Sequence, residues 1–316
     1  MRILVTGAAG FIGWNLTRVL RERHPGALIV GVDNLWTGRR REQEFVSKMY
    51  EMDVRHLGTK FPHHTHSFDY VYHLASPASP KHYQSLPLDT IETNFLGLLE
   101  SLKFLEHGGT IFMASTSEVY GDPLVSPQRE SYKGSVNCVG VRACYDESKR
   151  LCETYLTDHR RMHGTRVKIA RLFNVYGPGT LEDDGRAVSN FVCRALRGED
   201  LEVYGDGDQT RCFTYVDDVV EAIAHLVEDT GDFAGPINIG SDLDLSVQTI
   251  ANIVRNVTRS ESRIVNIAAV EDDPRQRLPE LTLARRILGW NPLTLVPPTV
   301  GISRTADYFR AELGIK

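Results

Sequence analysis

The sequence has little that would place the chain outside the cell, in a membrane or on nucleic acid. Only five of its 316 residues are cysteine, an odd number, and no two have C-x-x-C spacing. Free thiols in a reducing cytoplasm are therefore expected. No apolar run approaches the roughly 20 residues of a membrane helix, and the apolar N-terminus is too short for a signal peptide. The net charge of −5 gives no electrostatic reason to expect nucleic acid or an anionic membrane as a partner.

What is present is an ordinary globular composition, with 41% hydrophobic and 24% charged residues. Strands alternate with helices as far as about residue 175, and the pattern then becomes mixed. We expect an α/β fold, a Rossmann-type doubly wound parallel sheet with a smaller mixed α/β C-terminal substrate lobe. The cofactor domain would span residues 1–175, completed by about 212–242. The substrate lobe would comprise residues 176–211 and 243–316.

A short apolar strand, residues 2–6, runs directly into Gly7, Gly10 and Gly13, and a helical apolar pattern follows. Such glycines permit a tight turn and bring backbone N–H groups onto a pyrophosphate at the helix N-terminus. The spacing is G-x-x-G-x-x-G rather than the commoner G-x-G-x-x-G. The alternative is that these glycines only pack a strand–helix turn.

The second predicted strand, residues 27–32, ends at Asp33, twenty residues beyond Gly13. A carboxylate there accepts hydrogen bonds from the adenosine ribose and repels a 2′-phosphate, which favours NAD over NADP. Arg39, Arg40 and Arg41 follow closely and leave NADP open as the alternative. Asp53 and Val54, after the third strand, are expected at the adenine edge. The histidines of residues 63–66 lie in a polar loop without further ligands, so no metal site is predicted.

Two further strand ends carry candidate groups. Residues 70–74 run into the small residues 75–80, where a cofactor can approach the backbone, and His73 is expected to be a buried core histidine. A helix is expected over residues 87–106. The strand at 110–114 leads to Thr116 and Glu118, which we expect to face the reacting group of the substrate, although either could be a simple strand cap.

Tyr145 and Lys149 are four residues apart on a predicted helix and so share one face. A nearby ammonium lowers the pKa of a phenol, and a phenolate can take a proton from a sugar hydroxyl while a nicotinamide takes the hydride. A solvated helix face is the alternative for this pair. Arg211 and Arg277 in the second lobe are candidates for holding a diphosphate.

Taken in order, these motifs resemble the extended short-chain dehydrogenases/reductases that act on nucleotide sugars. Within that superfamily the chain most resembles the UDP-glucuronate decarboxylase (UDP-xylose synthase) family, through residues 73–80 with Tyr83, 115–118, 142–147 and 183–191. The resemblance implies oxidation of the sugar C4 by NAD, loss of CO2 from the 4-keto acid and re-reduction. The 4,6-dehydratases of the superfamily have an Asp where this chain has Ser117. A 4-epimerase or 4,6-dehydratase is one alternative, and a catalytically inactive NAD-bound sensor or scaffold is another.

The resemblance also implies residue roles. Thr116, Glu118, Tyr145 and Lys149 would be catalytic. The UDP-sugar would contact Lys81, Tyr83, Asn174, Asn190, Tyr204, Arg211 and Arg277. NAD would contact Gly7, Gly10, Phe11, Ile12, Gly13, Asp33, Asn34, Thr37, Gly38, Asp53, Val54, Leu74, Ala75, Ser76, Thr93, Tyr145, Lys149, Val175 and Arg186. The family commonly dimerises through two long helices, here near residues 87–106 and 145–163, so a homodimer is expected.

Overall fold

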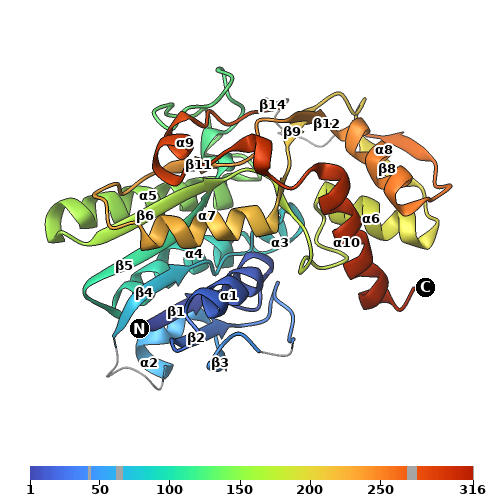
Figure 1. The fold of residues 1–316 in the computed structure, drawn as a ribbon. Coiled ribbons are helices and arrows are strands. Elements are labelled where there is room, and N and C mark those ends of the chain that lie inside the picture. The colour runs from blue at the N-terminus through green and yellow to red at the C-terminus, as the bar shows by residue number, and fades with distance from the viewer. Residues whose placement is uncertain (42–43, 62–66, 269–275, 316) are drawn as a thin grey trace.

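The computed structural model describes residues 1–41, 44–61, 67–268 and 276–315. The histidines of residues 63–66 therefore lie outside the described residues. Within these ranges the main feature is a seven-stranded sheet of order β11-β6-β5-β4-β1-β2-β3, in which every neighbouring pair is parallel (Figure 1). Its strands are β1 (Arg2–Thr6), β2 (Leu28–Asp33), β3 (Lys48–Glu51), β4 (Phe68–His73), β5 (Leu105–Thr116), β6 (Arg166–Leu172) and β11 (Ile237–Ile239). This confirms the predicted doubly wound sheet.

Helices cover both faces of the sheet, which is why its strands are apolar on both sides. Ile3 and Val5 of β1 pack in one hydrophobic core with helices α1 (Phe11–Arg23) and α7 (Val216–Glu228). Leu4, between them, points to the opposite core, formed with α4 (Pro87–Leu102) and α5 (Ala143–His163). Side chains alternate across a strand, so one short strand anchors both layers.

The helix expected over residues 87–106 ends earlier, at Leu102. The chain turns at Lys103, and β5 begins at Leu105, which pairs with Phe68 of β4. The last residues of the expected helix thus belong to the central sheet. The short elements near the sheet are η1 (Val54–His56), α2 (Leu57–Lys60), α3 (Pro80–Ser85) and η2 (Ser117–Tyr120).

A smaller lobe stands beside the carboxyl ends of the strands (Figure 1). It contains α6 (Ala187–Arg197), α8 (Val247–Thr258), α10 (Pro298–Leu313), the pair β8 (Leu201–Tyr204) and β13 (Ile264–Ile267), and a sheet of β9 (Thr210–Cys212), β12 (Asp244–Ser246) and β14 (Gln276–Arg277). The pair β7 (Val175–Tyr176) and β10 (Thr214–Tyr215) lies where the chain passes between lobes. Helix α9 (Thr282–Leu288) packs on β11 and α7, so the chain returns to the large sheet after β14.

Candidate active site

The glycine turn between β1 and α1 fits a dinucleotide. Gly7 has φ +73°, and a Cβ there would lie 2.7 Å from the Ala75 nitrogen. A Cβ on Gly13 would lie 2.0 Å from the Gly7 carbonyl oxygen, so no larger residue fits. These close approaches leave the backbone of the turn bare at the N-terminus of α1. The helix end can therefore receive an anionic pyrophosphate.

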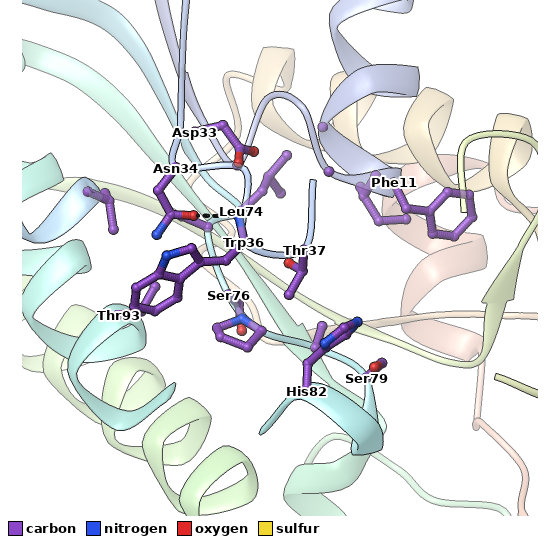
Figure 2. Close-up of a pocket in the computed structure, with 18 of the residues that line it drawn as sticks. Phe11, Asp33, Asn34, Trp36, Thr37, Leu74, Ser76, Ser79, His82 and Thr93 are labelled. Carbon is purple, nitrogen blue, oxygen red and sulfur yellow. Dashed lines mark hydrogen bonds between the residues drawn. The ribbon is translucent and has the colours of Figure 1, made fainter. Parts of the chain in front are cut away.

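Asp33 lies at the end of β2 and lines the same pocket as the glycine turn. It accepts hydrogen bonds from the N–H groups of Ala9 at 3.0 Å and Leu35 at 2.8 Å. Burial raises the pKa of Asp33, and the backbone N–H bonds oppose that rise. Figure 2 shows Asp33 and Asn34 at one end of the pocket, with Ser79 and His82 at the other. This is the arrangement expected for a ribose-binding carboxylate.

The three arginines after Asp33 are engaged with other groups. Arg39 pairs with Glu312 and Arg40 with Glu51. Arg41 donates a hydrogen bond to the Gly179 carbonyl oxygen at 2.7 Å and lies over the Trp14 ring. The charges of Arg39 and Arg40 are thus paired with carboxylates, whereas Arg41 contacts neutral groups; Asp33 is the feature that favours NAD over NADP.

Most of the predicted cofactor residues line this pocket; Tyr145, Lys149 and Val175 line the adjoining cavity, and Asp53 and Gly38 line neither. The Asp53 carboxylate accepts a hydrogen bond from the Arg55 N–H and forms an ion pair with the Arg55 guanidinium at 2.7 Å. It therefore begins helix η1 and turns away from the pocket, while Val54 lines it. Sequence reasoning missed Trp36, whose ring lies across the pocket (Figure 2) with Arg55 at 5.3 Å. An aromatic residue three positions after Asp33 was the available signal.

A cavity of about 670 Å³ adjoins the cofactor pocket and holds the predicted catalytic residues. Tyr145 and Lys149 reach it from α5, and Thr116 and Glu118 from the end of β5 and from η2. The Tyr83 ring stacks on Tyr145, with the ring centroids 5.1 Å apart and the planes 8° from parallel. The structure therefore brings the four residues together at the edge where parallel sheets bind ligands.

The electrostatics of Tyr145 differ from the prediction that Lys149 lowers its pKa. Burial raises the pKa of Tyr145, the negative charge of Glu118 adds to the rise, and the Thr116 hydroxyl and Arg186 oppose it. The Lys149 ammonium donates a hydrogen bond to the Ala114 carbonyl oxygen at 3.0 Å, and burial lowers its pKa to about 8. That ammonium lies 5.7 Å from the centre of the Tyr145 ring. The net direction is opposite to the prediction, because burial outweighs the groups that lower the pKa of Tyr145.

Glu118 forms ion pairs with two arginines, Arg277 of β14 and Arg142 just before α5. Burial alone would raise the pKa of Glu118, but the two guanidiniums outweigh it and lower the pKa below its usual range. Arg277, which is expected to contact a diphosphate, lines the cavity and pairs with this buried carboxylate. Its side chain is only 5% exposed.

The other predicted substrate residues line the same cavity: Lys81, Tyr83, Asn174, Asn190, Tyr204 and Arg211. Lys81 forms an ion pair with Asp183 at 2.7 Å, which joins α3 to the segment before α6. Arg186 lies between the two pockets, paired with Asp184 at 2.8 Å and 5.3 Å from the Phe11 ring. Val175, which was predicted to contact NAD, also lines this cavity.

His73 was expected to be a buried core histidine, and the structure confirms this. His73 is buried, donates a hydrogen bond from Nε2 to the Asn94 carbonyl oxygen, and has a pKa lowered by burial to about 3. The five cysteines, all in described positions, form no disulfide. Over the ranges that the structure describes there is no cluster of potential metal ligands, and no helix is both long and apolar enough to span a bilayer.

Comparison with known proteins agrees with this geometry. The chain is 45% identical to UDP-glucuronic acid decarboxylase 6 of Arabidopsis thaliana, over 100% of this chain and 90% of that protein. Among solved structures it resembles the UDP-glucose 4-epimerase of Thermotoga maritima, with a TM-score of 0.87, 30% identity, and coverage of 99% of this chain and 100% of that one. The UDP-glucose 4-epimerase of Thermus thermophilus, solved with NAD, gives a TM-score of 0.83 at 28% identity, covering 98% of this chain and 99% of that one. Residues 3–240 match the NAD dependent epimerase/dehydratase family, and the chain belongs to that family.

Proposed function

We propose that this protein is an NAD-dependent UDP-glucuronate decarboxylase that forms UDP-xylose. The observation that carries the proposal is the 45% identity, over the whole chain, to a plant UDP-glucuronic acid decarboxylase. The composition of the cavity supports it, because a tyrosine, a threonine and a lysine for C4 oxidation stand beside a carboxylate held by two arginines.

NAD, held by the glycine turn and Asp33, would supply the acceptor and later the donor of the C4 hydride. Tyr145 must be a phenolate to take the proton of the C4 hydroxyl, and Thr116 holds that oxygen beside it. Because burial raises the pKa of Tyr145, the positive charges of Lys149, Arg186 and an oxidised nicotinamide would be needed to favour the phenolate. The raised pKa of Tyr145 also suits the second half of the reaction, in which the phenol must give its proton back to the C4 oxygen.

Between these two transfers the sugar is a β-keto acid. The C5–C6 bond breaks, its electron pair passes into the C4–C5 enolate, and C6 leaves as CO2. A proton then adds at C5, and the net reaction consumes one proton and releases CO2. Glu118 is ionised and buried, so it is placed to order the group or water that delivers the C5 proton.

The charges around Glu118 favour an anionic sugar. The guanidiniums of Arg142 and Arg277 both pair with Glu118. Both arginines also line the cavity, so a uronate carboxylate bound there can pair with a guanidinium.

Two other reactions start from the same C4 ketone. A 4,6-dehydratase must protonate the departing C6 hydroxyl, and Ser117, buried in the cavity wall, cannot serve as that acid. A 4-epimerase needs no C6 chemistry, and the fold similarity to UDP-glucose 4-epimerases makes it the second candidate.

The test is to incubate purified protein with UDP-glucuronate, with and without added NAD, and follow the nucleotide sugar by mass spectrometry. Loss of CO2 to a UDP-pentose supports the decarboxylase, and NMR distinguishes xylose from a released 4-keto pentose. An unchanged mass with a changed NMR spectrum would mean epimerisation. No change of either kind would refute both.

We further propose a cytoplasmic homodimer. In each copy, residues 1–175 and 212–242 form the cofactor domain and residues 176–211 and 243–316 form the nucleotide-sugar lobe, apart from α9, which packs on β11 and α7. Exposed apolar side chains of α4 and α5, Leu88 at 73%, Ile91 at 39% and Leu151 at 44%, supply a surface for a second copy. The five free thiols favour a reducing compartment. Light scattering during gel filtration would test the oligomer, and a monomer with the mass of one chain would contradict it.

A further inference from the structure

The ion pair between Glu118 and Arg277 joins segments 159 residues apart in the chain. A buried amide side chain also holds each segment. Asn238 bonds to the segment of Glu118, and Gln128 bonds to the segment of Arg277. Gln128 is 1% exposed and Asn238 is fully buried. Neither lines the cavity, so neither touches a bound sugar.

Gln128 is bonded along the segment that follows Arg277. Its backbone N–H donates to the Leu278 carbonyl oxygen at 2.7 Å, and its side-chain Oε1 accepts from the Leu278 N–H at 2.9 Å. Its carbonyl oxygen accepts from the Glu280 N–H at 2.8 Å, while its Nε2 donates to the Val125 carbonyl oxygen at 2.7 Å. A residue whose four polar groups are all satisfied in this way fixes the position of the neighbouring strand.

Asn238, on β11, connects that segment to the helix that carries Glu118. Its Oδ1 accepts a hydrogen bond from the Tyr120 hydroxyl at 2.7 Å, and Tyr120 is the last residue of η2. Its Nδ2 donates to the carbonyl oxygens of Gln128 at 2.9 Å and Glu280 at 3.1 Å. The Tyr120 hydroxyl is bonded in turn by Arg171 at 2.9 Å. One amide group thus fixes η2 and the residues after Arg277 relative to each other.

We propose that Gln128 and Asn238 are positioning residues for the decarboxylation step, holding Arg277 and Glu118 in register without contacting the substrate. This rests on the proposed function, in which these two charged groups serve the carboxylate and C5 rather than C4. Tyr145 and Lys149 lie on α5, which Gln128 does not contact through any of the bonds above. Displacing Arg277 therefore slows the loss of CO2 and leaves the C4 oxidation in place.

The test uses Gln128→Met in the NAD-loaded enzyme with UDP-glucuronate in single-turnover experiments. Near-ultraviolet absorbance follows reduction of the nicotinamide, and trapped CO2 follows decarboxylation. A displacement on the order of 1 Å can cost about a hundredfold in rate, so we expect CO2 release to fall by about ten- to a hundredfold. Reduction should keep its wild-type rate, and the reduced cofactor should therefore accumulate.

Matched variants separate positioning from general destabilisation. Lys168→Met breaks the buried ion pair with Asp229, of 2.9 Å, at the other end of β6, and should slow neither step. Gln128→Glu keeps an acceptor for the Leu278 N–H and should recover part of the CO2 rate. Should Gln128→Met not fold, Gln128→Asn, whose shorter side chain cannot make the Leu278 bond, carries the same expectation.

The outcomes separate this inference from the proposed function. A Gln128 variant that slows both steps equally, or neither, overturns the positioning role while wild-type CO2 release stands. A wild-type enzyme that releases no CO2 from UDP-glucuronate overturns the proposed function, and the inference fails with it.

Discussion

Replacing Glu118 by Gln should destabilise the fold because it removes the carboxylate that pairs with the buried Arg277. The Glu118 and Arg277 side chains are only 13% and 5% exposed, so water cannot solvate the Arg277 guanidinium in place of that carboxylate. Breaking a buried ion pair by removing one partner costs about 3–5 kcal/mol. The Gln amide still accepts a hydrogen bond, which places the expected loss near the lower end, about 3 kcal/mol.

The assay is urea unfolding at neutral pH with a fixed NAD concentration. Glu182→Gln is the matched control, because it removes an exposed partner of Arg197, with side chains 48% and 38% exposed. Exposed pairs contribute about 0–1 kcal/mol, so this variant should unfold almost as the wild type does. A Glu118→Gln protein within about 1 kcal/mol of wild type would refute the reasoning.

The pH dependence gives an independent check of the same charge. Because the folded pKa of Glu118 lies below its ordinary value of 4.5, its stabilisation is fully present above that pH. It is lost as the pH falls through the lower folded pKa, and the gap between wild type and Glu118→Gln should close there. UDP-glucuronate, whose carboxylate can replace the missing charge, should also raise the melting temperature of the variant more than UDP does.

Three further substitutions test other parts of the site and core. Tyr145→Phe should keep bound NAD, measured after denaturation, and abolish product formation by mass spectrometry; normal turnover would contradict the mechanism. Asp33→Ser should weaken NAD binding by about tenfold or more, because a charged acceptor contributes about 1.5–3 kcal/mol, and calorimetry showing unchanged affinity would exclude the ribose contact. His73→Met should flatten the fall in unfolding free energy between pH 6.5 and about 3, since the buried imidazole stays neutral there while the unfolded chain takes up a proton. An unchanged acid slope would show that His73 titrates in the folded protein.

The sequence predicted those parts of the molecule that depend on local pattern. The strand, glycine turn and helix at the N-terminus, the place of Asp33 and the shared face of Tyr145 and Lys149 all follow from spacing along one segment. The early end of α4 was missed because its last residues pair with β4, and such pairing overrides helical periodicity.

What the sequence could not give depends on contacts between distant segments. Arg277 pairs with Glu118, 159 residues away in the sequence, and Asp53 pairs with Arg55 rather than lining the pocket. The pKa of Tyr145 depends on how completely α5 and the second lobe exclude water, which no spacing encodes. Gln128 belongs to no recognisable motif. Its role depends on a hydrogen bond with Leu278, which is distant in the sequence.

The long separation between Glu118 and Arg277 has a consequence for synthesis. As the chain leaves the ribosome, the strands and glycine turn of the first half can assemble early, as N-terminal units generally do. Glu118 meets Arg142 soon afterwards, but its second partner and the segment that Gln128 fixes arrive only when 277–280 emerge. A nascent chain stalled before that point would have a folded cofactor domain but would lack the Arg277 partner of Glu118. The ability to bind NAD should therefore appear before the ability to process a sugar.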